Sequence, residues 1–181
     1  MHPTKKKCIS KKMKDWMTNI ESKIFPGGGE PAFMDVLDAW RAEDNKLVFT
    51  NGCFDILHLG HVDYLAKAAG LGDRLIIGLN TDASVSRLKG PGRPVNNQVA
   101  RATLLAAFTF VDAVVLFDEE TPYELIRTIQ PDFLVKGGDY REREIVGYDI
   151  VREKNGKVIV VDFLEGYSSS ELIRKLTLKH E

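Results

Sequence analysis

Two histidines, His58 and His61, stand three residues apart, directly after an apolar run. At this spacing both imidazoles fall on the same side of a helical turn, and Gly60 between them leaves the backbone open to an approaching phosphate. The pair is therefore expected to bracket one phosphoryl group. If a helix begins near Gly60, its free N–H groups and positive dipole end add to the same anion site. The arrangement points to the chemistry of nucleotidyl transfer.

A pair of histidines at this spacing is also typical of a solvated turn. The context favours the functional interpretation, because the pair lies where a strand should meet a helix, which is where open parallel α/β sheets bind ligands. The wider pattern is Asn51-Gly52-x-Phe54-Asp55-x-x-His58-x-Gly60-His61. It resembles the nucleotidyltransferase superfamily, which includes cytidylyltransferases and pantetheine-phosphate-type adenylyltransferases.

Apolar runs alternate with amphipathic stretches from residue 47 onward. Strands are expected at 47–50, 74–79, 113–117, 133–135 and 157–163, and helices at 60–69, 101–110, 122–129, 142–153 and 169–178. Strands this apolar are buried on both faces, which predicts a parallel sheet flanked by helices. The expected fold class is therefore α/β, a Rossmann-like, doubly wound parallel sheet of five strands with an N-terminal helical extension.

The N-terminal segment differs from the rest of the chain in charge. Residues 1–24 contain seven lysines against Asp15 and Glu21, a charge of +5, so the remainder carries −6 in a chain of net charge −1. Apolar residues recur in this segment at helical spacing, namely Ile9, Met13, Trp16, Met17, Ile20 and Ile24. We expect this stripe to pack on its own domain or on a partner subunit rather than on a membrane surface.

A linker at 26–31 and a helix at 32–42 then lead into the first of the five expected strands. Pro and Gly dominate the linker and break the chain there. We therefore divide the chain into an N-terminal helical extension with its Gly/Pro linker, residues 1–45, and a nucleotidyltransferase domain, residues 46–181.

Composition excludes several classes of protein. With 181 residues, 44% hydrophobic and 28% charged, the chain fits one globular catalytic domain. No apolar run is long enough for a membrane span and no signal peptide is recognisable, so we expect a cytoplasmic protein without membrane insertion. The acidic main body is a poor nucleic-acid binder. Cys8 and Cys53 are too few for a disulfide framework or a zinc site. We also expect a homodimer.

Further candidates follow the ends of the other expected strands. After the strand at 74–79 come Asn80 and then a stretch at 87–96 in which cations alternate with glycines. This stretch reads as a mobile positive loop suited to polyphosphate, with Lys89 and Arg93 as its contacts.

Two later stretches complete the candidate set. After the strand at 133–135, adjacent glycines would let the backbone meet a flat base, while Lys136 supplies charge and Asp139 an acceptor. The serines at 168–170 open the last expected helix, where hydroxyls and free N–H groups form both a cap and an anion cradle.

Longer stretches narrow the resemblance to the adenylyltransferase domain of bacterial ADP-heptose synthases, the D-glycero-manno-heptose 1-phosphate adenylyltransferases. The stretches are FTNGCFDILHLGHVDYL, GDRLIIGLNTDASVSRLKG, GRPVN, VDAVVLF, TPYELI and PDFLVKGGDYREREIVG. The last is the most diagnostic, because glycerol-3-phosphate cytidylyltransferases carry a different sequence there. The synthases' sugar-kinase domain is missing, which implies a stand-alone transferase. Val99 and Ala100 stand where relatives carry acidic residues before Arg101.

The resemblance implies transfer of AMP from ATP to a heptose 1-phosphate, giving ADP-heptose and pyrophosphate for bacterial surface-glycan synthesis, such as lipopolysaccharide core or S-layer precursors. The substrates are small molecules, a nucleoside triphosphate and a sugar phosphate. An ionised sugar phosphate can attack in line without a general base, and Mg²⁺ would arrive on the phosphates rather than in a protein cage. Alternatives are a CTP-dependent cytidylyltransferase for glycerol 3-phosphate or a related polyol phosphate, an FMN adenylyltransferase, or a nucleotide-binding regulator without catalysis.

The candidate residues fall into three groups. The expected catalytic residues are His58, His61 and Lys89. The expected nucleotide-binding residues are Thr50, Asn51, Gly52, Phe54, Gly60, Lys136, Gly137, Asp139, Ser168, Ser169 and Ser170. The expected substrate-binding residues are Asp55, Asn80, Arg93 and Arg101.

Overall fold

A computed structural model of the chain describes residues 15–138, 140–167 and 174. Its strands are β1 (Ile24–Phe25), β2 (Leu47–Gly52), β3 (Arg74–Asn80), β4 (Ala113–Phe117), β5 (Phe133–Gly137) and β6 (Lys157–Val161). Residues 15–21 are helical. The later helices are α2 (Pro31–Ala42), α3 (Leu59–Ala69), α4 (Asp82–Lys89), α5 (Gln98–Ala106), α6 (Tyr123–Ile129), the 3₁₀ turn η1 (Glu142–Glu144) and α7 (Tyr148–Glu153).

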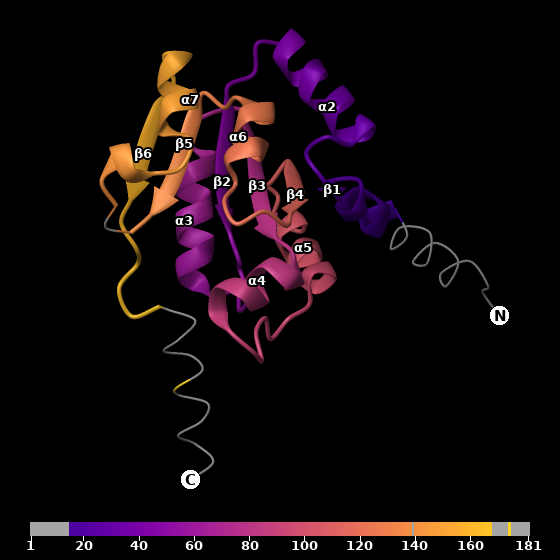
Figure 1. The fold of residues 1–181 in the computed structure, drawn as a ribbon. Helices are drawn as coiled ribbons and strands as arrows, with labels where there is room; N and C mark the ends of the chain where they lie inside the picture. Colours follow the sequence, from indigo (N-terminus) through magenta and orange to yellow (C-terminus); the bar gives the residue numbers. More distant parts are fainter. Residues whose placement is uncertain (1–14, 139, 168–173, 175–181) are drawn as a thin grey trace, which may run out of the picture.

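The strands form one parallel sheet in the order β1-β4-β3-β2-β5-β6 (Figure 1). The order runs outward from β2 in both directions, so β2 and β5 flank the point where the winding reverses. This confirms the predicted Rossmann-like, doubly wound α/β class. Open sheets of this kind bind ligands outside the carboxyl ends of the strands at that reversal.

The predicted count of five strands is wrong, because β1 adds a sixth at one edge. Ile24 and Phe25 pair with Val114 and Val115 of β4. A strand of two residues has no periodicity of its own, and its pairing partner lies about ninety residues away in the sequence, so no local pattern could indicate it.

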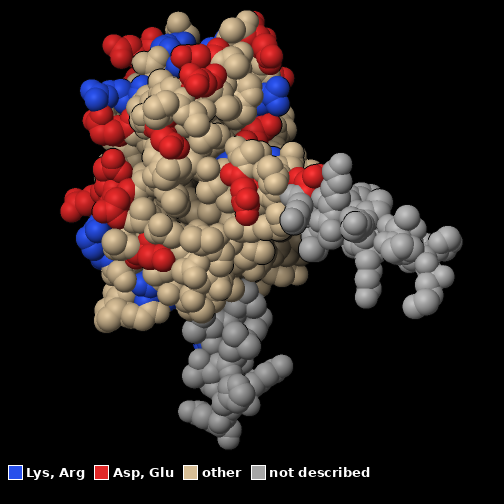
Figure 2. Space-filling model, turned by 90° about the vertical axis from the view of Figure 1, so that its right-hand side faces the viewer, with Lys and Arg blue, Asp and Glu red and all other residues tan. Residues whose placement is uncertain are grey.

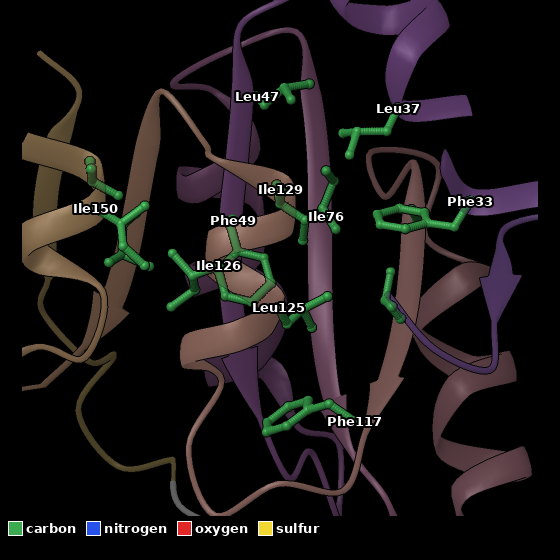
Figure 3. Close-up of a cluster of buried hydrophobic side chains, with 14 of the residues drawn as sticks. Phe33, Leu37, Leu47, Phe49, Ile76, Phe117, Leu125, Ile126, Ile129 and Ile150 are labelled. Carbon is green, nitrogen blue, oxygen red and sulfur yellow. The ribbon is translucent and has the colours of Figure 1, made fainter. Parts of the chain in front are cut away.

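Each face of the sheet has its own hydrophobic core. Side chains alternate along each strand, so Phe49 and Ile76 enter one cluster while Val48 and Ile77 enter the other. The first cluster is covered by α2, α6 and α7, as Figure 3 shows for Phe33, Leu37, Leu125, Ile126, Ile129 and Ile150. The second is covered by α3 and α5 through Tyr64, Leu65, Ala68, Ala102, Leu105 and Ala106.

Two regions differ from the elements expected. The helix α4 at 82–89 was not predicted, and its last three residues, 87–89, belong to the stretch at 87–96 that was expected to be a loop. The Thr81 hydroxyl caps its start by accepting from Ser84 N–H, and Gly90, at φ 87°, ends it. The helix expected at 142–153 is split into η1 and α7 by Gly147 at φ 88°. A Cβ at Gly147 would lie 2.7 Å from Ile126 Cδ1, so a residue with a side chain is excluded there.

The N-terminal segment is attached to the same body. Ile20 and Ile24 pack against the second cluster, while Trp16 and Met17 are exposed. Lys23 Nζ donates to the Val111 carbonyl at 2.8 Å. The expected packing on its own domain is therefore confirmed for the end of the stripe. Ile9 and Met13 lie outside the described residues, as does the last expected helix apart from its Arg174.

Charges of both signs are interspersed on the side of the molecule shown in Figure 2, with acidic side chains the more frequent. Several cations there and elsewhere have acidic partners, for example Arg41 with Asp38 and Arg74 with Asp112. Within the described part of the chain, no helix is both long and apolar enough to cross a bilayer.

Candidate active site

A cavity of about 340 Å³ opens at the carboxyl ends of β2 and β5, where the winding of the sheet reverses. Its walls come from the loop after β2, from α3, from the end of α4 and from the segments after β5 and β6. The lining residues are Asn51, Gly52, Cys53, Phe54, Asp55, His61, Tyr64, Lys89, Lys136, Gly137, Tyr140 and Phe163. The volume is in the range of small-molecule sites, roughly 300–1,000 Å³.

The two histidines sit at the start of α3. His58 is the N-cap residue and makes no side-chain capping bond, so the helix start is open to an anion. The imidazoles of His58 and His61 stack with centroids 3.9 Å apart, and Phe54 lies 5.3 Å from His61 on a tilted plane. Nothing fits between stacked rings. A phosphate can therefore meet the pair at its edge, and the expected contact of both rings with one phosphoryl group stays a prediction.

Burial favours the neutral form of both imidazoles in the free protein. The pKa of His61 falls from 6.5 to about 4, first because of burial and then because the Lys89 ammonium, and His58 whenever it is protonated, disfavour a second positive charge nearby. Burial also lowers the pKa of His58. Nδ1 of each ring is buried and has no hydrogen-bond partner among the described residues. An arriving phosphate supplies the opposite charge, which favours the protonated form.

Two glycines make room for aromatic side chains at the cavity. A Cβ at Gly60 would lie 3.1 Å from the His58 ring and from Tyr167 Cβ. A Cβ at Gly137 would lie 2.6 Å from Phe163 Cε1. At both positions the missing side chain is what lets an aromatic ring approach the backbone.

Two lysines bring positive charge to the cavity from opposite sides. Lys136, at the end of β5, is partly buried and donates to Asn51 Oδ1 at 3.2 Å. Burial lowers its pKa, because a desolvated ammonium is costly. Lys89, the last residue of α4, is exposed at the rim. An anion between them would stabilise both charges.

Asp55 holds the loop that follows α4. Its fully buried carboxylate accepts from Arg93 Nε at 2.5 Å, from Val95 N–H at 2.7 Å and from Asn96 N–H at 3.1 Å. Burial alone would raise the pKa of Asp55, but the hydrogen bonds from Asn96, Arg93 and Val95 lower it overall. The charges of Asp55 and Arg93 are thus paired with each other. The loop that was expected to be mobile is fixed at this point.

Arg101 is fully buried and donates within the protein. Its guanidinium reaches Asn96 O at 3.0 Å, Cys53 O at 2.6 Å and Asp82 Oδ1 at 2.7 Å. These acceptors belong to three segments around the cavity. The geometry favours a positioning role for Arg101 over direct contact with a substrate.

Thr50 and Asn80 are likewise engaged inside the protein. The Thr50 hydroxyl lies 2.6 Å from the Tyr64 hydroxyl, which donates to the Val135 carbonyl at 3.1 Å and so ties β2, α3 and β5 together. Burial raises the pKa of Tyr64 to about 12. Asn80 Nδ2 donates to Ser84 Oγ at 3.0 Å. Both residues support the walls of the cavity.

The structure thus brings many of the expected site residues to one cavity: Asn51, Gly52, Phe54, Asp55, His61, Lys89, Lys136 and Gly137. Asp139 and the three serines at 168–170 lie outside the described residues. Tyr64, Tyr140 and Phe163 line the cavity but were not anticipated. Tyr64 had a signal, because it follows His61 by three residues and shares its helical face.

No group of three or more His, Cys, Asp or Glu side chains converges on a possible metal position in the described ranges. The buried carboxylate of the cavity, Asp55, is already paired with Arg93.

Comparison with known proteins places the chain in a family. The cytidylyltransferase-like family model matches residues 49–175. Proteins named "Bifunctional protein HldE" are 60% identical over 137 residues in Wolinella succinogenes, 55% over 139 in Gluconobacter oxydans and 56% over 142 in a Campylobacter jejuni strain. The matches cover 76%, 77% and 78% of this chain but 28%, 29% and 30% of the relatives, so the chain spans less than a third of their length.

Solved structures agree on the fold. A lipopolysaccharide core biosynthesis protein from Thermoplasma volcanium is 27% identical, with a TM-score of 0.55, over 68% of this chain and 99% of that one. A pantoate-beta-alanine ligase from Francisella tularensis is 15% identical with a TM-score of 0.55 over 87% of this chain and 78% of its own, a likeness of fold alone. The resemblance to the nucleotidyltransferase superfamily is confirmed, and the chain belongs to the cytidylyltransferase-like family.

Proposed function

We propose that this protein transfers AMP from ATP to a sugar 1-phosphate, specifically a heptose 1-phosphate. The observation that carries the proposal is the cavity between the ends of β2 and β5. There His61, which stacks on His58 at the start of α3, and two lysines line a space suited to a nucleotide. These are donors and cations rather than a nucleophile with its base, as phosphoryl chemistry requires.

The step is a direct displacement. An oxygen of the acceptor phosphate attacks the α-phosphorus of ATP, the bond from that phosphorus to the bridging oxygen breaks, and pyrophosphate leaves with the electron pair. The acceptor phosphate is already ionised, so no side chain has to remove a proton. The protein's task is to align two anions and to stabilise the charge that develops on the leaving group.

His58, His61 and Lys89 are proposed to carry out this stabilisation. Burial lowers the pKa of both imidazoles in the free protein, and an approaching phosphate raises it again, so the rings can donate hydrogen bonds where charge builds up. Asn51, Lys136 and Gly137 are proposed to hold the nucleotide side of the cavity. Mg²⁺, carried in on the phosphates with several waters, would neutralise part of their charge.

The choice of ATP and a heptose rests on two supports. The stretch PDFLVKGGDYREREIVG resembles the ADP-heptose synthases rather than the glycerol-3-phosphate cytidylyltransferases. The relatives at 55–60% identity share one name, and the Thermoplasma protein is titled for lipopolysaccharide core biosynthesis. A role in supplying surface-glycan precursors follows from this pairing.

The test is pyrophosphate release with ATP and with CTP against a panel of sugar 1-phosphates and polyol phosphates, with the product identified by mass. ATP with heptose 1-phosphate should exceed CTP by about tenfold or more in kcat/KM, because a site that pairs the polar edge of a purine leaves buried groups unsatisfied with a pyrimidine, at about 1–3 kcal/mol each. CTP with glycerol 3-phosphate as the better pair would assign the chain to the cytidylyltransferases.

Other properties belong to the same proposal. We propose a cytoplasmic homodimer that does not bind nucleic acid. Its charge beyond residue 24 is −6, the total of −1 less the +5 of residues 1–24. The division at residues 45 and 46 is supported by the family match, which begins at 49.

A further inference from the structure

A second cavity, of about 210 Å³, shares a wall with the first. Asn51, Lys136 and Tyr140 line both spaces. Among the described residues, His61 and Lys89 line only the larger one. Transfer between two phosphorylated substrates needs two pockets that meet at one point, with the phosphate machinery on the nucleotide side. The two cavities have this relation.

Lys136 marks the point where the cavities meet. Its ammonium can donate three hydrogen bonds, and within the described part of the chain it makes one, to Asn51 Oδ1 at 3.2 Å. No carboxylate of the described residues pairs with it. A partly buried cation with a neutral partner is best stabilised by an anion. A phosphate of an acceptor lying in the second cavity would supply that anion beside the α-phosphate of ATP.

The remaining walls of the second cavity suit a sugar. Pro122, Ile145 and Val146 provide apolar surface, and Glu144 adds a carboxylate. The carboxylate lies 3.8 Å from Arg141 Nη1, and both side chains of this pair are largely exposed, so the pair is weak and leaves oxygen atoms available. Carboxylate oxygens accept from hydroxyls, while apolar side chains cover the carbon face of a ring.

Glu144 is held by a rigid turn. It ends η1, where its N–H donates to the Arg141 carbonyl at 2.9 Å. The next residue, Ile145, is buried in the core, and Gly147 packs closely on Ile126. The turn is therefore anchored on both sides, as a residue that discriminates between hydroxyl groups requires.

We propose that the second cavity binds the sugar of the acceptor, with its phosphate at Lys136 and with Glu144 accepting hydrogen bonds from sugar hydroxyls. The inference rests on the proposed function and assigns a specificity residue to it. The nucleotide then occupies the larger cavity, and the bond is exchanged where the two cavities meet.

The test compares Glu144→Ala with Glu142→Ala, a change on the same exposed turn that lines neither cavity. A third variant, Val146→Trp, fills the second cavity. Steady-state kinetics with heptose 1-phosphate and ATP would be combined with calorimetric binding of a non-hydrolysable ATP analogue. Glu144→Ala should raise KM for the sugar phosphate about tenfold, the effect of losing a charge-assisted hydrogen bond. Val146→Trp should raise it at least as much, and Glu142→Ala should leave it unchanged.

ATP-analogue affinity and KM for ATP should stay within about twofold in all three variants. A raised KM for ATP in Glu144→Ala would place the nucleotide in the second cavity and overturn the inference. An unchanged KM for the acceptor in Glu144→Ala would remove Glu144 as a specificity residue, and in Val146→Trp it would remove the cavity as the sugar site. Failure of the unmodified protein to release pyrophosphate with any sugar 1-phosphate is a separate result that overturns the proposed function and this inference together.

Discussion

His61 brings to the candidate site a partly buried imidazole whose pKa is lowered. Its ring stacks on that of His58 and contacts Phe54 at a tilted angle, and its Nδ1 has no partner in the described part of the protein. The sequence identified this residue by type and spacing. It could not show that the rings stack, because ring orientation depends on packing against Phe54 and on the space left by Gly60.

Replacing His61 by alanine should lower kcat by about 10²–10³, the loss expected when one transition-state donor is removed. KM for ATP should change much less, since Lys89 and Lys136 still attract the triphosphate. The measurement is steady-state pyrophosphate release at saturating ATP, with a circular dichroism spectrum to check the fold. Turnover near that of the unmodified protein would exclude His61 from the mechanism.

The lowered pKa of His61 also links stability to pH. Its pKa is about 4 in the folded protein against 6.5 ordinarily, so between these values the unfolded chain binds a proton that the folded chain does not. The free energy of unfolding should therefore fall as the pH is lowered from about 6.5 to about 4. Urea unfolding at pH 7 and pH 5 should show a smaller loss for His61→Gln than for the unmodified protein. Equal losses would contradict the low pKa.

At the scale of elements, the sequence predicted strands and helices where apolar periodicity was strong and missed structure specified by single residues. The bounds of β4 were predicted correctly from a continuous apolar run. The helix α4 was not predicted because its composition is polar, although Thr81 before it and Gly90 after it are cap signals. Gly147 splits the helix expected at 142–153 because its left-handed backbone cannot continue a helix.

The loop after α4 depends on Asp55, and this contact was not visible in the sequence because it joins segments forty residues apart. Asp55→Ala leaves Arg93 Nε and the N–H groups of Val95 and Asn96 without their acceptor. We expect a loss of about 2–4 kcal/mol in the free energy of unfolding and a lower kcat. The control is Asp38→Ala, which removes an exposed pair with Arg41 and should cost less than about 1 kcal/mol. Equal effects in urea unfolding would show that Asp55 does not organise the loop.

At the scale of the molecule, one doubly wound sheet gathers groups that are far apart in the chain. Asn51 and Lys136 meet because β2 and β5 are neighbours, and Lys89 joins them from the far end of α4. Sequence reasoning could predict this convergence, because every candidate follows a strand and parallel strands end at one edge. It could not predict the second cavity, whose walls include η1 and the loop before α6.

The N-terminal segment adds the strand β1 to the edge of the sheet, so truncations that keep and that remove this strand should have different effects. Deleting residues 1–14 should leave activity unchanged, since the candidate site residues all follow residue 49. Deleting residues 1–25 removes β1 and Phe25, whose ring lies 5.1 Å from that of Phe33 in the core. This longer deletion should cost about 3–5 kcal/mol, as for loss of a buried phenylalanine, and expose the edge of β4.

Phe25→Ala in the full chain separates packing from strand pairing and should reproduce most of the loss. The measurements are urea unfolding and kcat for each protein, with size-exclusion chromatography to follow assembly. Because β2, β5 and α3 carry the cavity, any truncated protein that still folds should retain kcat. If the protein lacking residues 1–25 folds but is inactive, the extension completes the site. If that protein is also monomeric while the full chain is a dimer, the extension completes the site of the partner subunit.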